Sequence, residues 1–128
     1  FDVKTGILLW KQKINSSLRP TLIDKLIFTI TMEGFLVVIE KDTGNIIRIT
    51  NVFDKIKEED RPKIKPVGFV MGKKQIYLTT NNGRLITIDI VSGRSSSIHK
   101  IDNQKISRPF VVNEKLFIIK DNAIIKID

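Results

Sequence analysis

Short apolar runs alternate with polar turns along the whole chain, at the spacing of strands. The runs at 25–31, 75–80 and 115–120 are rich in β-branched and aromatic residues, a composition that favours a pleated strand over a helix. The turns that follow carry glycine or asparagine, residues that tolerate the positive φ angles of tight hairpins. The pattern therefore predicts an all-β chain built from antiparallel hairpins.

The predicted strands recur in groups of four. Each group begins after a basic residue and a proline, and proline suits the first position of a strand because it has no N–H to donate. First strands are predicted at 21–23, 67–70 and 110–112, second strands at 25–31, 75–80 and 115–120, third strands at 35–40, 84–90 and 123–128, and fourth strands at 7–13, 45–50 and 94–98. Four short antiparallel strands per unit are typical of one blade of a β-propeller.

A turn phrase, an acidic residue followed three and four positions later by Thr or Ser and Gly, sets the length of the repeat. Its copies are Asp2, Thr5 and Gly6; Glu40, Thr43 and Gly44; and Asp89, Ser92 and Gly93. The acidic residue returns at 2, 40, 89 and 128, in steps of 38, 49 and 39 residues, and a period of about 40 to 50 residues marks propellers and related arrays. We therefore expect an all-β propeller segment of about three four-stranded antiparallel blades.

The boundaries of the repeats divide residues 1–128, a single segment, into five parts. These are an orphan fourth strand with its linker (1–17), a blade (18–50), an inserted loop (51–64), a second blade (65–99) and an incomplete blade (100–128). The strand predicted at 7–13 and the edge at 123–128 are complementary by repeat position. Because propellers typically have about four to eight blades, we expect two copies to supply each other's missing strand in a homodimer.

The inserted loop is the candidate site of contact with a partner. Loops on a rigid scaffold often carry function, and this one is strongly charged. The candidate contact residues are Asp54, Lys55, Lys57, Glu58, Glu59 and Arg61. The alternative is a solvated connector with a turn of helix across 54–59.

Few residues in the sequence offer chemistry. The chain has no cysteine, which excludes disulfides and thiolate metal sites. His99 is its one histidine, whereas zinc sites need three or four ligands together, and no serine lies in a nucleophile elbow. We therefore predict no catalytic, cofactor-binding or metal-binding residues and no cofactor. No apolar stretch approaches the roughly 20 residues that span a bilayer, and any targeting signal is expected outside the chain.

The basic charge leaves a further function open. Lys and Arg number 22 against 14 Asp and Glu, a net charge of +8, and a strongly basic domain can bind nucleic acid or an anionic surface. The basic residues are spread over turns and strand starts, however, and aromatic residues make up only 7%. We expect no binding to DNA, and keep a basic nucleic-acid or anionic-surface module as an alternative.

The best-preserved copy of the turn phrase continues to a tryptophan. Asp2, Thr5, Gly6 and Trp10 closely resemble the docking motif of quinoprotein-type (PQQ-like) β-propellers, in which tryptophans tie neighbouring blades into a ring. Arg48 and Ser97 occupy the tryptophan positions of the later copies, where Glu40 also replaces the first aspartate. The resemblance thus implies docking at Trp10 but not at the next two turns.

Within that superfamily the chain is most similar to the BamB-like (YfgL-like) lipoprotein component of the outer-membrane β-barrel assembly machinery. The resemblance implies a noncatalytic, periplasmic scaffold, associated with the outer membrane, that binds the central assembly subunit. The alternative is an enzyme, a fragment of a PQQ-dependent dehydrogenase. Such enzymes hold a calcium ion with carboxylate and amide oxygens, and the sequence does not group these ligands.

Overall fold

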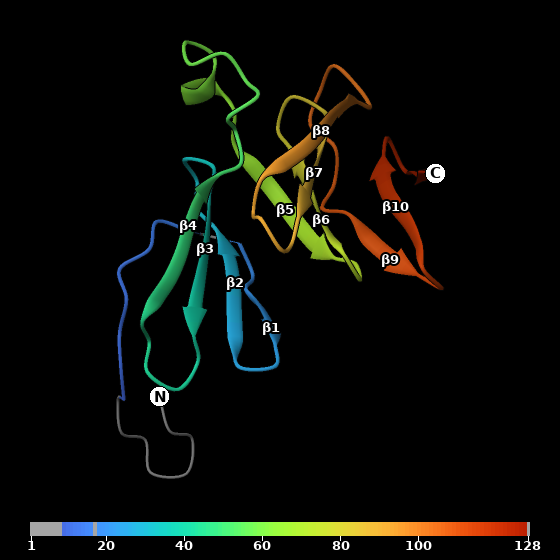
Figure 1. Cartoon of the computed structure of the whole chain (residues 1–128). Coiled ribbons are helices and arrows are strands. Elements are labelled where there is room, and N and C mark those ends of the chain that lie inside the picture. The colour runs from blue at the N-terminus through green and yellow to red at the C-terminus, as the bar shows by residue number, and fades with distance from the viewer. Residues whose placement is uncertain (1–8, 17, 128) are drawn as a thin grey trace.

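The computed structural model describes residues 9–16 and 18–127, which form three antiparallel sheets (Figure 1). Blade 1 contains β1 (Thr21–Ile23), β2 (Leu26–Ile30), β3 (Phe35–Glu40) and β4 (Ile46–Asn51); blade 2 contains β5 (Pro66–Met71), β6 (Gln75–Thr80), β7 (Arg84–Asp89) and β8 (Ser95–Lys100); blade 3 contains β9 (Phe110–Val112), β10 (Lys115–Lys120) and β11 (Ala123–Ile127). Each strand pairs with its neighbours in chain order. The prediction of an all-β segment of about three antiparallel blades is confirmed.

The main core lies between blades 1 and 2. It is formed by apolar side chains from both sheets and from the β4–β5 loop: Phe28, Ile30, Leu36, Val38, Val52, Phe53, Ile64, Phe69, Ile76, Leu78, Ile86 and Ile88. Fully burying one such side chain stabilises the fold by about 1.5–3 kcal/mol. The central strands β3 and β7 each bury four consecutive residues and so anchor their blades.

Blade 3 is the least covered sheet. Its first strand β9 lies against β5, and Leu116 and Ile118 of β10 are buried. On its other face Phe110 and Phe117 stack with their ring centroids 5.6 Å apart, and Ile119 and Ile124 are 47% and 70% exposed. This blade thus has one packed face and one open face.

The predicted orphan fourth strand is absent from the residues that the structure describes. Residues 9–13 form no strand, and residues 7 and 8 lie outside the described part. A strand needs a ladder partner; the segment 9–16 instead runs beside blade 1 (Figure 1) and accepts one backbone hydrogen bond there, from Met32 N to Asn15 O. The described part of the chain also shows no pairing of this segment with β11, whose neighbour in the sheet is β10.

The inserted loop contains a short 3-10 helix, η1 (Arg61–Lys63), at a different place from the turn of helix considered for 54–59. Pro62 explains the position, because proline has the backbone angle of a first helical turn and its missing N–H is not needed there. Among the described residues, no helix is long and apolar enough to cross a membrane.

Candidate functional site

Trp10 and Gln12 hold the turn of blade 1 that begins at Glu40. The Trp10 indole N–H donates a hydrogen bond to the Lys41 carbonyl at 2.7 Å, and the Gln12 amide donates to the Gly44 carbonyl at 2.7 Å. Gly44 has a φ of +76°, and a Cβ atom there would lie 2.4 Å from the indole. Only glycine lets the half-buried ring lie this close to the turn.

Arg48 and Thr50 hold the next turn in the same way. The Arg48 guanidinium donates to the Ile90 carbonyl at 2.8 Å and to the Val91 carbonyl, and the Thr50 hydroxyl donates to the Gly93 carbonyl at 2.7 Å. These contacts match the first junction position by position. Arg48 therefore docks on this turn as Trp10 docks on the first. The resemblance to the tryptophan motif did not imply docking at this turn.

A β-bulge helps to aim the docking side chain. Val38 pairs with Arg48 and Ile39 with Ile46, so Ile47 is an extra residue in β4. The same irregularity in blade 2 leaves Ser96 as the extra residue, directly before Ser97. Bulges bend a strand and redirect its side chains, so the repeat preserves the geometry of docking even where the docking residue changes.

The turns themselves are built alike. The Gly44 N–H donates to the Glu40 carbonyl and the Gly93 N–H to the Asp89 carbonyl, each at 2.8 Å. The hydroxyl groups of Thr43 and Ser92 accept hydrogen bonds from the backbone two residues later. Asp2, Thr5 and Gly6 lie outside the described residues. The motif positions at 40–44 and 89–93 thus have structural contacts in the turn.

The third junction is open in the part of the chain that the structure describes. Ser97 and His99 hold the docking positions, and they line a crevice of about 560 Å³ between blades 2 and 3 together with Tyr77, Glu114 and Ile127. A second groove of about 670 Å³ adjoins it at Tyr77 and Glu114. Serine is too short to dock as Trp10 and Arg48 do, so blade 3 needs another anchor.

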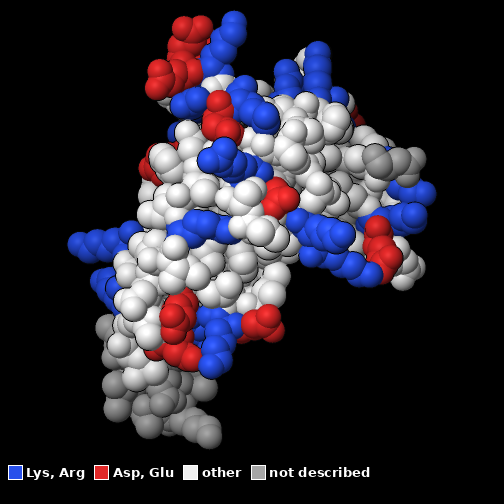
Figure 2. All heavy atoms as spheres, viewed as in Figure 1, with Lys and Arg blue, Asp and Glu red and all other residues white. Residues whose placement is uncertain are grey.

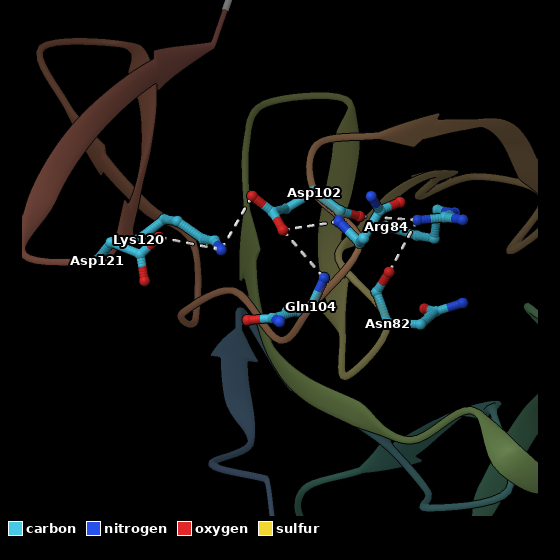
Figure 3. Close-up of polar contacts among 7 residues, drawn as sticks. Asn82, Arg84, Asp102, Gln104, Lys120 and Asp121 are labelled. Atoms are coloured by element: carbon cyan, nitrogen blue, oxygen red, sulfur yellow. Dashed lines mark hydrogen bonds and ion pairs between the residues drawn. The ribbon is translucent and has the colours of Figure 1, made fainter.

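That anchor is a polar network around Asp102, in the linker before β9 (Figure 3). The Asp102 carboxylate accepts hydrogen bonds from the N–H groups of Asn103 and Gln104 and pairs with the Lys120 ammonium at 3.0 Å. Its carbonyl accepts a hydrogen bond from the Arg84 guanidinium at 2.9 Å. The network therefore ties the β6–β7 turn, the linker and the end of β10 together.

The ion pair shifts both titrations. The hydrogen bond from Lys120, with those from the backbone N–H groups, lowers the pKa of Asp102 below its ordinary value. The pKa of Lys120 is raised, first by Asp102 and then by Asp121, which lies 3.2 Å from the ammonium. Both groups are therefore charged across the neutral range. Sequence reasoning missed this pair, since 18 residues separate its members.

The β4–β5 loop has a braced base and an exposed tip. Val52 and Phe53 are fully buried and Ile64 is 7% exposed, while the Arg61 guanidinium donates to the carbonyl groups of Ile56 and Asp54. The Asp54 carboxylate accepts a hydrogen bond from the Ser95 hydroxyl. Two of the six predicted contact residues, Asp54 and Arg61, thus have structural partners.

The other four predicted contact residues lie on the tip. Lys55, Lys57, Glu58 and Glu59 are all exposed. The loop stands away from the blades in Figure 1, and acidic side chains project from its tip in Figure 2. Basic side chains on the face in Figure 2 are scattered over the blades and form no single surface. The loop therefore presents both charges on a short, supported projection.

His99, the one histidine of the chain, is an exposed residue of β8. Within residues 9–16 and 18–127, no three histidine, cysteine or acidic side chains come together as a group that could hold a metal ion. The polar side chains of the crevice are therefore not arranged as a multidentate cation site.

No family model and no curated protein matches this sequence. Solved structures of β-propellers, in contrast, match its fold. The crystal structure of BamB from Moraxella catarrhalis superimposes with a TM-score of 0.74 and 15% identity, over 98% of this chain and 35% of BamB. This chain has the fold of a PQQ-like β-propeller.

Quinohemoprotein alcohol dehydrogenases share this fold. The enzyme ADHIIG from Pseudomonas putida HK5 gives a TM-score of 0.61 with 19% identity, over 85% of this chain and 17% of the enzyme. The enzyme from Comamonas testosteroni gives 0.59 with 21% identity, over 79% and 16%. The resemblance that we drew from the turn phrase and Trp10 is thus confirmed at the level of the fold. The chain spans about a third or less of the length of each of these proteins.

Proposed function

We propose that this chain is part of a noncatalytic scaffold that binds another protein through the tip of the β4–β5 loop. The observation that carries the proposal is the loop itself. Its base is fixed by the buried Val52 and Phe53 and by the hydrogen bonds of Arg61, while its charged tip is exposed. A preorganised loop loses less conformational entropy on binding than a mobile one.

More specifically, we propose that this scaffold acts in outer-membrane protein assembly. BamB matches nearly the whole chain, with a higher TM-score than the two dehydrogenases, and this likeness of fold supports a periplasmic, outer-membrane-associated protein whose partner is the central assembly subunit. The open face of blade 3 and the edge of β11 support the proposed homodimer, since unpaired edges favour association.

Binding of the purified chain to the periplasmic domains of that subunit tests the proposal. The loop variant Lys57→Ala/Glu58→Ala should weaken binding by about tenfold, because tip charges in an interface are partly desolvated. Lys41→Ala/Asp42→Ala is the matched control: it removes an exposed basic and acidic pair from the Glu40–Gly44 turn and should leave binding unchanged. Equal binding by both variants would contradict the role of the loop.

The second candidate is a fragment of a quinone-dependent dehydrogenase, which the two alcohol dehydrogenase structures favour. A ligand that binds the native state stabilises it by RT ln(1 + c/Kd), where c is the ligand concentration, so the melting temperature rises as the ligand concentration exceeds the dissociation constant. A rise in melting temperature with pyrroloquinoline quinone and calcium together, and with neither alone, would support the enzyme over the scaffold.

A further inference from the structure

The first strand of every blade is entered through a basic residue and a proline. The three pairs are Arg19-Pro20, Lys65-Pro66 and Arg108-Pro109. Other repeat positions have diverged, as the series Trp10, Arg48 and Ser97 shows, whereas the positive charge before the proline is present in all three blades. The basic residues therefore lie at equivalent positions of the repeat, where the chain enters β1, β5 and β9.

Two of these side chains line one small pocket. Arg19 and Arg108 border a hollow of about 240 Å³ together with Leu18 and with the β5 residues Val67, Gly68 and Phe69. Residues flanking three blades thus meet at one place, because β9 lies against β5. No acidic side chain lines the pocket, and both of the charged residues that line it are arginines.

Gly68 positions Arg108. A Cβ atom on Gly68 would lie 2.6 Å from Cγ and 2.7 Å from Cβ of Arg108, so the arginine stem crosses the bare backbone of β5. The φ angle of Gly68 is outside the positive range, and its conformation does not require glycine. The absence of a side chain therefore serves the close approach of Arg108, which holds the stem on one track.

The charged ends of both arginines are free of protein partners. Among the described residues, neither the Arg19 nor the Arg108 guanidinium forms a hydrogen bond or ion pair. Arg48 and Arg84, in contrast, each bind two backbone carbonyl groups. Arg108, whose stem is held against Gly68 and whose fork is free, is therefore preorganised for an oxyanion, and Arg19 adds a second free guanidinium to the same pocket.

We propose that Arg19 and Arg108 bind the carboxylate groups of an acidic peptide segment of a partner protein. This deepens the proposed scaffold function and rests on it for the nature of the partner. A planar guanidinium fork matches a carboxylate with two parallel hydrogen bonds. The one aromatic side chain at the pocket, Phe69, is 4% exposed, so the pocket offers no platform for the base stacking that single-stranded nucleic acids use.

Fluorescence anisotropy with a labelled hepta-glutamate peptide tests the site on the intact chain. Arg19→Gln and Arg108→Gln should each weaken binding about five- to tenfold, the order expected for one charge-assisted contact. Gly68→Ala should weaken it similarly while both arginines remain, because the new methyl group displaces the Arg108 stem. Arg94→Gln, which removes an exposed arginine elsewhere, is the matched control and should bind as the wild type does.

Three outcomes would overturn the proposal. The first is that Arg94→Gln weakens peptide binding as much as the two pocket variants do. The second is that Arg19→Gln and Arg108→Gln bind the peptide as tightly as the wild type. The third is that a single-stranded oligonucleotide binds more tightly than the peptide and depends on Arg108. The Lys57→Ala/Glu58→Ala variant distinguishes a failure of the acidic-peptide site from a failure of the scaffold function. If it abolishes partner binding while the arginine variants leave peptide binding unchanged, the scaffold function stands and the acidic-peptide site falls. Circular dichroism of each variant confirms that it is folded.

Discussion

At the scale of single residues, two different side chains make the same contact at equivalent positions of the repeat. Trp10 uses a ring and one N–H against the Glu40 turn, and Arg48 uses a guanidinium fork against the Asp89 turn. Both are large, planar donors that cover a glycine and bind the carbonyl group after the acidic residue. The repeat therefore constrains shape and hydrogen bonding at this position rather than aromatic character.

The Arg48→Ala variant should lose about 2 kcal/mol of unfolding free energy, since hydrogen bonds from charged groups are worth about 1.5–3 kcal/mol each and these are partly exposed. Urea denaturation measures the change. Arg94→Ala removes an exposed arginine near the same turn and should change the free energy by less than about 0.5 kcal/mol. Equal effects of the two variants would show that Arg48 does not dock.

A double-mutant cycle isolates the contact between Trp10 and Gly44. Trp10→Ala should cost about 2–3 kcal/mol, below the usual cost for a fully buried tryptophan, since this ring is half-buried. Gly44→Ala should cost more in the wild type than in the Trp10→Ala background, where only the positive φ angle, about 1–2 kcal/mol, still opposes the methyl group. Identical costs in both backgrounds would mean that the ring does not lie on the turn.

At the scale of elements, the strands follow from local pattern and the anchors between blades do not. Phe35–Glu40, Gln75–Thr80 and Lys115–Lys120 form strands at the predicted bounds, because their composition and flanking turns act locally. The fourth strand expected at 7–13 is absent over residues 9–13, because a strand also requires a neighbour. The Asp102–Lys120 pair joins residues distant in sequence, and no local pattern indicates such a contact.

The same distinction holds for the predicted contact loop. Its charge is visible in the sequence, but the roles of Asp54 and Arg61 depend on Ser95 and on the carbonyl of Ile56, contacts that only the folded chain defines.

Trypsin should cut the native chain first after Lys55 or Lys57 on the exposed tip of the β4–β5 loop. Phe53→Ala should speed this cleavage several-fold, because the fully buried ring holds the base of the loop. Faster cutting at Lys25 or Lys41 than at the loop would contradict the assignment.

Blade 3 should respond to pH through its polar anchor. Because the pKa of Asp102 is lowered, its stabilisation is present above the ordinary value of 3.8 and is lost as pH falls through the lowered pKa. Because the pKa of Lys120 is raised, its stabilisation is present below 10.5 and is lost as pH rises through the raised pKa. The wild type should exceed Lys120→Gln in denaturant midpoint by a constant amount between these limits. A difference that persists undiminished in strong acid would contradict the ion pair.

At the scale of the whole molecule, one turn phrase both ends a blade's third strand and receives the docking groups from the fourth-strand position of the preceding unit. Blades 1 and 2 share a continuous core, and blade 3 is held by fewer apolar side chains and by the Asp102 network. Among the surfaces that this packing leaves exposed are the charged tip of the β4–β5 loop and the pocket lined by Arg19 and Arg108.

Hydrogen exchange of the chain, alone and with the periplasmic domains of the central assembly subunit, tests the central claim most directly. In the free chain, amides of β3 and β7 should exchange most slowly and those of β10 and β11 faster, because protection follows burial and packing. With the partner, new protection should appear at 55–59. Unchanged exchange at the loop, together with new protection on adding quinone and calcium, would contradict a scaffold and indicate an enzyme fragment.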